Sequence, residues 1–318
     1  MERVVFFGTP QFAVPSLAAL CAAGYRPRLV VSQPARPAGR GRRVQDPPLA
    51  AWARTAGLDV AQPAKVNTRR FRESIAALAP DLGVVVAYGA ILTRQLLAVP
   101  RLGFVNVHAS LLPRYRGAAP IQAAIAAGDG TTGVTTMRME PGLDSGPVLL
   151  QREVPILPRE TAGELAPRLA AAGAELLVET LRGLERGGVE PRPQDPAAAS
   201  YAPKLTKADG EVDWGLPAAR LCDRLRAFTP WPGLRAELGG EEVKLLGLDP
   251  VDPAGAAGGE APGTILGTDG AAVLVRCGGG TAVAVHRAQR PGRGPVTGAE
   301  LARSLGPAAG SPAAGGGE

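Results

Sequence analysis

One stretch of the sequence carries the side chains best suited to acid–base chemistry. It runs from Gly103 to Gly117 and reads GFVNVHASLLPRYRG. Its apolar and β-branched first half predicts a strand, on which Asn106 and His108 lie two residues apart and point to the same face. An amide beside an imidazole supplies a hydrogen-bond donor and a group that titrates near neutral pH. The chain has 2 histidines, His108 and His286, so an imidazole acid or base must be one of them.

A carboxylate that could serve this pair lies in the turn EPGLDSG, residues 140–146. Asp144 stands there between two glycines, a setting typical of a simple Asx-turn. The same residue could instead lie beside His108, fix its tautomer and stabilise its charged form, as carboxylates do in catalytic triads. The spacing along the sequence leaves both interpretations open.

These residues must be positioned by a sheet that is buried on both faces. Apolar runs predict strands over residues 3–7, 28–32, 81–87, 102–108, 132–139 and 148–154, and helices over 49–56, 69–78, 121–127 and 161–186. A run such as DLGVVVA is typical of a parallel strand covered by helices. We therefore expect an α/β fold with an open, mostly parallel Rossmann-like sheet, whose ligands bind at the carboxyl ends of the strands.

An arginine-rich loop follows the second strand, from Gln33 to Pro48, and reads QPARPAGRGRRVQDPP. It is too rich in proline and glycine for a regular element. Its arginines either form a solvated, flexible surface or contact a phosphate backbone, since guanidinium groups pair with phosphates bidentately. The sequence gives these two interpretations equal weight. The arginines are Arg36, Arg40, Arg42 and Arg43.

A proline-rich connector marks the boundary to a second domain. After it, a helix over 216–228 and short strands over 234–238, 243–248, 263–266, 271–277 and 282–286 predict a small β-barrel or sandwich. We expect a catalytic domain over residues 1–189, a linker over 190–208, a β-barrel domain over 209–305 and a disordered tail over 306–318. The tail offers too little apolar surface to order itself.

The composition is that of a soluble globular protein, with 318 residues, 45% hydrophobic and 20% charged. No apolar run approaches the roughly 20 residues of a membrane span, and the N-terminus lacks the anatomy of a signal peptide. The 3 widely spaced cysteines argue against a disulfide framework, so we expect a cytoplasmic location. The net charge of +6 permits a polyanionic partner. No exposed apolar stripe stands out, so we expect a monomer.

Six motifs, in order along the chain, resemble those of one enzyme family. They read FGTPQFAV, QPARPAGRG, VVVAYG, NVHASLLPRYRGAAPIQ, MEPGLDSGP and RAFTPWPG. From about Arg3 to Arg303 the chain is similar to the methionyl-tRNA formyltransferases, and the PAGRG loop together with RAFTPWPG favours these over other formyltransferases. The resemblance implies transfer of a formyl group from 10-formyltetrahydrofolate to the α-amino group of methionine on initiator methionyl-tRNA, in bacterial translation initiation.

The resemblance also implies roles for particular residues, and no metal. The catalytic set would be Asn106, His108 and Asp144. The folate site would be lined by Ser110, Leu111, Leu112 and Pro113, with a pterin pocket formed by Tyr88, Gly89, Ile91 and Gly142. Arg36, Arg40, Arg42 and Arg43 would meet the acceptor end of the tRNA. The second domain would be a barrel of the oligonucleotide-binding (OB) kind and a further tRNA surface.

In this assignment the amide of Asn106 and His108 would stabilise the oxyanion that develops during acyl transfer. Asp144 would polarise His108 or relay a proton through a water molecule. Two stretches depart from the family pattern. His286 and Arg287 replace a more apolar pair, which makes His286 a residue of the barrel surface or a tRNA contact rather than a catalytic residue. The insert from Gly255 to Gly259 has no role that the sequence indicates.

Three alternative functions differ in the features that they require. A formyltransferase acting on a sugar nucleotide or on glycinamide ribonucleotide would need neither the arginine loop nor the appended barrel. A non-catalytic RNA-binding protein would not need the three catalytic residues, and an aromatic content of 4% limits base stacking. A nicotinamide enzyme is disfavoured because the fingerprint GxGxxG is missing after the first strand.

Overall fold

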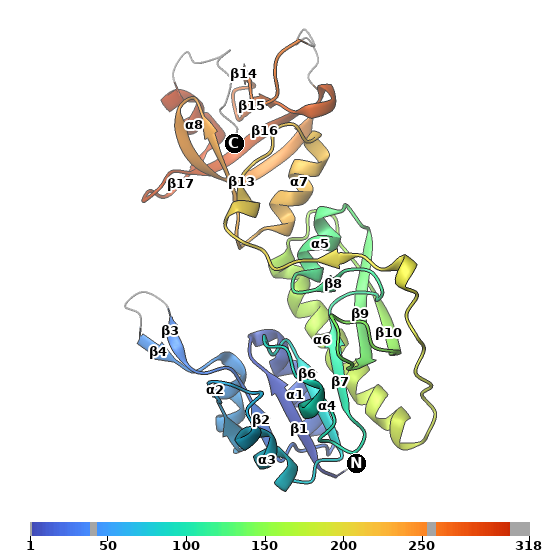
Figure 1. Cartoon of the computed structure of the whole chain (residues 1–318). Coiled ribbons are helices and arrows are strands. Elements are labelled where there is room, and N and C mark those ends of the chain that lie inside the picture. The colour runs from blue at the N-terminus through green and yellow to red at the C-terminus, as the bar shows by residue number, and fades with distance from the viewer. Residues whose placement is uncertain (1, 39–42, 253–258, 306–318) are drawn as a thin grey trace. The chain divides into compact units, whose positions relative to one another are not determined.

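A seven-stranded sheet organises the N-terminal part of the chain, with the strand order β10-β9-β7-β6-β1-β2-β5 (Figure 1). The computed structural model describes residues 2–38, 43–252 and 259–305. Neighbouring strands from β7 to β5 run parallel, whereas β9 and β10 are antiparallel to their neighbours. The expected mostly parallel Rossmann-like sheet is therefore confirmed. Its strands are β1 (Val4–Gly8), β2 (Leu29–Val31), β5 (Val60–Ala61), β6 (Leu82–Val86), β7 (Phe104–His108), β9 (Thr131–Arg138) and β10 (Val148–Pro155).

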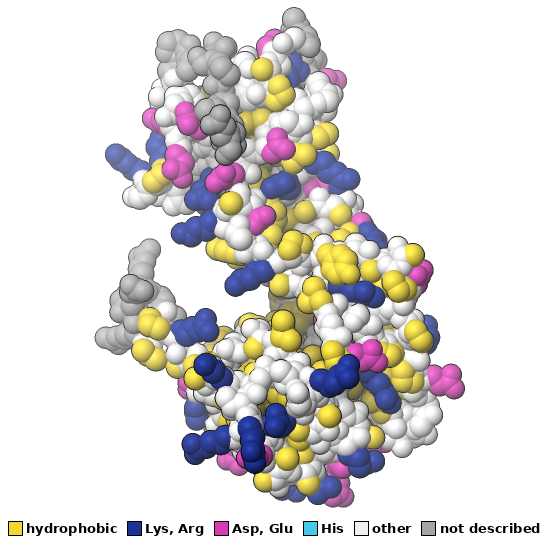
Figure 2. Space-filling model, viewed as in Figure 1, with side chains coloured by type: hydrophobic (Ala, Val, Ile, Leu, Met, Phe, Trp, Pro, Cys, Tyr) yellow, Lys and Arg dark blue, Asp and Glu magenta, His cyan; other side chains and the backbone are white. Residues whose placement is uncertain are grey.

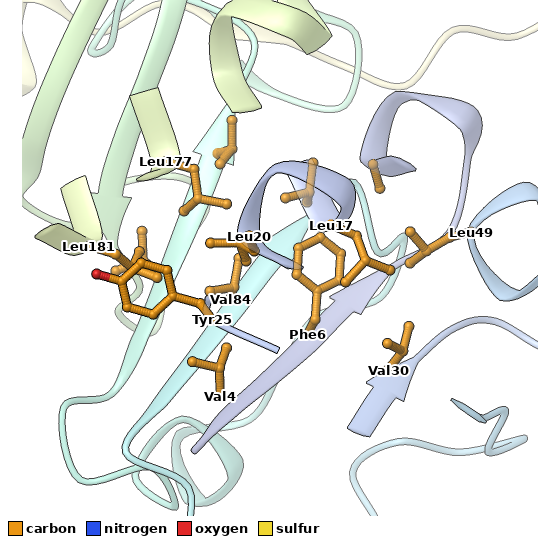
Figure 3. Close-up of a cluster of buried hydrophobic side chains, with 14 of the residues drawn as sticks. Val4, Phe6, Leu17, Leu20, Tyr25, Val30, Leu49, Val84, Leu177 and Leu181 are labelled. Carbon is orange, nitrogen blue, oxygen red and sulfur yellow. The ribbon is translucent and has the colours of Figure 1, made fainter. Parts of the chain in front are cut away.

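Helices cover both faces of this sheet, because alternate residues of each buried strand point to opposite sides. Figure 3 shows one face, where Phe6 of β1 lies beside Leu17 of the first helix, and where Leu181 of the long helix lies beside Tyr25 in the same apolar cluster. A second apolar cluster on the other face includes Val5, Phe7, Ile75, Leu96 and Phe104. The helices are α1 (Val14–Ala22), α2 (Pro48–Thr55), α3 (Arg69–Ala77), α4 (Arg94–Leu97) and α6 (Ala162–Glu185), with the short 3-10 helix η1 (Gln11–Ala13) before α1.

A buried carboxylate ties the start of β1 to β6, and this gives a first prediction. Asp81 Oδ2 accepts hydrogen bonds from the backbone N–H groups of Arg3 and Glu2, both at 3.1 Å, and these bonds, chiefly that from Arg3, lower the pKa of Asp81. We expect Asp81→Asn to lower the free energy of unfolding by about 1–2 kcal/mol at pH 7. Because the folded-state pKa is depressed, this contribution is present above the ordinary pKa of an aspartate and is lost as the pH falls through the folded value.

Urea unfolding at pH 7 and near pH 3 checks this prediction. The difference between the wild-type protein and Asp81→Asn should shrink on acidification. The substitution Asp59→Asn at an exposed carboxylate serves as the control. A difference in unfolding free energy that stays constant with pH would contradict the role given to the Asp81 charge.

The arginine-rich loop contains a short hairpin that its composition does not predict. Strands β3 (Arg36–Ala38) and β4 (Arg43–Gln45) pair antiparallel, with Arg36 opposite Gln45. The expectation that this loop has no regular element is therefore wrong for these two strands. Hairpin pairing satisfies the backbone N–H groups of neighbouring residues without an apolar run, so the side-chain pattern carries no signal for it.

The chain's contacts divide it into two units. The first comprises residues 1–120, 131–155 and 165–202, and the second comprises residues 121–130, 156–164 and 203–318. The second unit contains an antiparallel sheet with the order β12-β13-β16-β15-β14, to which β17 adds by pairing with β16. Its strands are β12 (Leu234–Leu238), β13 (Glu241–Val251), β14 (Ile265–Thr268), β15 (Val273–Arg276), β16 (Ala282–Gln289) and β17 (Pro295–Thr297).

The pairing within this second sheet stops short of a closed barrel. No ladder joins β12 to β14 in the described part of the chain, so closure into an OB-type barrel stays a prediction. The helices are α5 (Pro120–Ala126), α7 (Ala218–Ala227) and α8 (Gly298–Leu305), with 3-10 helices η3 (Ala208–Gly210) and η4 (Gly278–Gly280). The expected disordered tail and most of the 255–259 insert lie outside the described residues. None of the described helices has both the length and the apolar composition needed to cross a membrane.

Candidate active site

The proposed catalytic amide and imidazole lie at the carboxyl end of β7, as the alternation of the strand predicts. β7 runs between β6 and β9, where Asn106 lies opposite Val85 on one side and Met137 on the other. The exposed fractions of Asn106 and His108 are 7% and 6%. The strand ends at His108, and the chain then enters a loop that leads to residue 117.

His108 is oriented by a backbone carbonyl. Its Nε2 lies 2.8 Å from the carbonyl oxygen of Tyr115, which can only accept, so Nε2 carries a hydrogen and donates it. In a neutral ring, Nδ1 is then the unprotonated nitrogen. Nδ1 lies 3.6 Å from Oδ2 of Asp144. A carboxylate at this distance stabilises positive charge on the ring once Nδ1 takes up a proton.

The structure brings the carboxylate of Asp144 to His108 from the loop between β9 and β10. Oδ2 also accepts a hydrogen bond of 2.9 Å from the backbone N–H of Gly117. Asp144 has φ +48°, a left-handed conformation that aspartate tolerates better than most residues. The two segments that follow β7 and β9 therefore meet at one carboxylate.

The segment predicted to line the folate site is held by buried polar side chains. Ser110 is fully buried, and its hydroxyl donates to the carbonyl of Arg114 at 2.6 Å. Thr135 Oγ1 donates to the carbonyl of Ser110 at 2.6 Å and accepts from the backbone N–H of Leu112 at 3.1 Å. Gln151 Nε2 donates to the carbonyl of Leu112 at 2.8 Å. Thr135 and Gln151 shape this loop, and no local sequence signal marks them.

The four residues predicted for the pterin pocket differ in their settings. Tyr88 lies in the core with its ring edge-on to Phe7, and its hydroxyl is buried without a hydrogen-bond partner among the described residues. Burial raises the pKa of Tyr88 to about 12, so the phenol stays neutral. Ile91 is 85% exposed, and Gly89 and Gly142 lie on exposed loops. Tyr88 also lines a cavity of about 410 Å³ bordered by Gln33, residues 63–68 and Ala90.

The four loop arginines are only partly described. Arg36 is exposed in β3, and the backbone of Arg43 belongs to β4. Arg40 and Arg42 lie outside the described residues. Within the described residues, no three His, Cys, Asp or Glu side chains are grouped so that they could hold a metal ion.

Two domain families match the sequence. Residues 2–181 match the family described as "Formyl transferase", and residues 204–306 match "Formyl transferase, C-terminal domain". The methionyl-tRNA formyltransferase of Anaeromyxobacter dehalogenans strain 2CP-C is 50% identical over 303 residues, which cover 95% of this chain and 97% of that protein. The chain belongs to the methionyl-tRNA formyltransferase family.

A second methionyl-tRNA formyltransferase, from Acidobacterium capsulatum, is 54% identical over 244 residues, which cover 76% of this chain and 78% of that protein. Among solved structures, the N-formyltransferase of Helicobacter canadensis in complex with folinic acid and dTDP-3-aminofucose has a TM-score of 0.66. It is 16% identical, and the match covers 90% of this chain and 99% of that one. This likeness is one of fold, so it is the relatives in sequence that place the chain among methionyl-tRNA formyltransferases.

Proposed function

We propose that this protein transfers the formyl group of 10-formyltetrahydrofolate to the α-amino group of methionine on initiator methionyl-tRNA. The observation that carries this proposal is the facing pair of His108 and Asp144 at the end of β7, in a chain of this family. The reaction belongs to bacterial translation initiation. We propose that the protein is cytoplasmic and monomeric.

The chemistry balances without a metal. The neutral amine attacks the formyl carbon, so a bond forms between that carbon and the methionine nitrogen while the carbonyl oxygen becomes an oxyanion. The bond between the carbon and the folate nitrogen then breaks. The attacking nitrogen loses one proton and the departing folate nitrogen gains one, which leaves tetrahydrofolate and a formamide.

The catalytic residues divide this work by their geometry. Nε2 of His108 is engaged by the Tyr115 carbonyl, so Nδ1 is the ring nitrogen left to interact with the reacting groups. Asp144 lies opposite Nδ1, at 3.6 Å. The amide of Asn106, on the same face of β7, supplies the second donor. We assign the folate site to Ser110, Leu111, Leu112 and Pro113, with Tyr88, Gly89, Ile91 and Gly142.

A surface of the second unit suits a nucleic-acid partner. Arg235 and Lys244 lie directly opposite each other in the β12–β13 ladder, and neither has a carboxylate partner among the described residues. Lys244 lies close to Gly233, two residues beyond Trp231, and the Trp231 side chain is 51% exposed. Cations without counter-charges are typical of surfaces that contact phosphates, and an exposed indole can stack a base. Figure 2 shows one face of the molecule, on which Lys and Arg side chains (dark blue) are interspersed with Asp and Glu (magenta).

We predict that the double substitution Arg235→Ala and Lys244→Ala raises the KM for tRNA several-fold with little change in kcat, because it removes cations that bind phosphates. The slope of log affinity against log salt should become shallower by about 1 for each phosphate group that is no longer bound. Initial rates over a salt series measure both. Arg40→Ala and Arg42→Ala should also raise the KM for tRNA, increasingly with salt, and leave folate binding unchanged.

Arg152→Ala is the matched control for this surface. Its guanidinium is already neutralised by Glu175 and Glu179, at 2.6 and 3.0 Å. This variant should keep the wild-type salt slope. A double variant with the same salt dependence as the wild-type protein would remove Arg235 and Lys244 from the tRNA surface.

The first test of the proposed function is incubation with 10-formyltetrahydrofolate and charged initiator methionyl-tRNA, with free methionine as the control. Formylation of the tRNA but not of free methionine supports the reaction, the donor and the macromolecular substrate together. Folate binding without formylation of tRNA would direct attention to sugar nucleotides and other small amines. Absence of folate binding would refute the proposal.

A further inference from the structure

We propose that Gln194 is a positioning residue that fixes Asp144 opposite His108, and that Arg116 in turn fixes Gln194. Gln194 lies in the proline-rich connector, 50 residues beyond Asp144 along the chain. No motif of the family resemblance includes it. The inference rests on the proposed function in so far as Asp144 and His108 are taken as catalytic.

The side-chain amide of Gln194 bridges two loops. Its Nε2 donates to the carbonyl oxygen of Asp144 at 2.8 Å and to that of Gly146 at 2.7 Å. Its Oε1 accepts from Nε and Nη2 of Arg116, at 3.0 and 2.7 Å. One amide therefore joins the backbone of the loop that carries Asp144 to the segment that follows β7.

Only one orientation of this amide satisfies all four hydrogen bonds. The arginine side chain has donors and no acceptor, so it requires Oε1. The two carbonyls have no hydrogen to donate, so they require the NH₂ group. Arg116 is 6% exposed and has no carboxylate partner in the described structure, so rotation of the amide would leave a buried charge without its acceptor.

Arg116 lies between the two backbone groups that hold the catalytic pair. Tyr115 supplies the carbonyl that orients His108, and Gly117 supplies the N–H that binds Asp144. A shift of Arg116 would therefore move both partners together. The distance of 3.6 Å between Nδ1 and Oδ2 depends on the register between these two loops, which Gln194 sets.

The rest of the connector reinforces the same loop. Ser200 Oγ accepts from the backbone N–H of Tyr115 at 2.9 Å. Strand β11 (Tyr201–Ala202) then pairs parallel with β8 (Arg116–Gly117). A side chain at Gly117 would collide with the carbonyl of Ala202, so a glycine is needed for this close approach. The short 3-10 helix η2 (Pro196–Ala198) lies between the two points of attachment.

The decisive variant is Gln194→Glu. A carboxylate keeps an acceptor for Arg116 and adds an ion pair, but it faces the carbonyls of Asp144 and Gly146 without a hydrogen to donate. We expect thermal stability near or above that of the wild-type protein, together with a kcat lower by about 10–100-fold, because small displacements of catalytic groups cost this much. The KM values for tRNA and folate should change little.

A direct readout of position is available because the chain has 2 histidines. Imidazole nitrogen NMR signals can be assigned with a His286→Gln variant, and the His108 signals and their titration should shift in Gln194→Glu. Gln194→Asn, which keeps the amide on a side chain shorter by one methylene, tests the same point if the glutamate variant does not fold. Asp195→Ala is the matched control, because among the described residues the Asp195 side chain binds the backbone N–H of Ala197, at 2.9 Å, and neither loop of the site.

One set of results would support the proposed role of Gln194, and another would overturn it. Lower kcat and shifted His108 signals in a stable Gln194→Glu protein, with wild-type values in Asp195→Ala, would support it. Wild-type kcat and unchanged His108 signals in a folded Gln194 variant would overturn it. If the wild-type protein does not formylate tRNA, the proposed function fails, whereas the His108 signals still decide whether Gln194 fixes the pair.

Discussion

Replacing His108 with alanine is expected to lower kcat by about 10²–10⁴-fold, the range typical of a donor or acid–base group at the reacting centre. The imidazole is 6% exposed, its Nε2 donates to the Tyr115 carbonyl, and its Nδ1 faces Asp144 at 3.6 Å. Single-turnover rates with charged initiator tRNA measure the loss without interference from product release.

His286→Ala is the control for this prediction. The second histidine lies in β16 of the second unit, where Nε2 is 3.0 Å from Oδ2 of Asp249. We expect its removal to leave turnover at saturating tRNA unchanged, in line with the barrel-surface or tRNA-contact role. A folded His108→Ala protein with turnover near the wild-type value would exclude His108 from the mechanism.

The second large effect is expected from Asp144→Asn, again a loss of about 10²–10⁴-fold in kcat. The substitution keeps the shape of the side chain and an oxygen for the N–H of Gly117, but removes the charge opposite Nδ1 of His108. Single-turnover rates with charged initiator tRNA measure the loss.

A folded Asp144→Asn protein with turnover near the wild-type value would contradict the role proposed for Asp144. Asp213→Asn is the control, since Asp213 accepts a hydrogen bond from the backbone N–H of Gly215 within its own turn.

Features with a local cause could be predicted from the sequence. The buried parallel strands follow from apolar runs such as LGVVV in β6, and the common face of Asn106 and His108 follows from the two-residue period of a strand. For Asp144, the local pattern left two interpretations, because an Asx-turn and a catalytic carboxylate use the same residue in the same type of loop. Only the packing of the two loops distinguishes them.

Features that depend on contacts between distant residues could not be predicted. Gln194 lies 50 residues from Asp144 and 78 from Arg116 along the chain, and an isolated glutamine carries no pattern. Thr135 and Gln151 lie within strands that the periodicity predicts. Their hydrogen bonds to the folate-site loop could not be predicted, because the hydrophobic pattern does not indicate which distant backbone groups a polar side chain binds. The β3–β4 hairpin escapes prediction for a related reason, since backbone pairing rather than side-chain burial defines it.

The attachment of the connector to the loop after β7 limits the positions at which the C-terminal domain could be exchanged for another. A gene fusion that exchanged the appended domain at residue 190 would cut away Gln194, Ser200 and strand β11, and with them the support of His108 and Asp144. An exchange after Ala202 would keep them. In evolutionary terms, we expect the connector to be inherited with the catalytic half and new substrate-binding modules to join the chain beyond it.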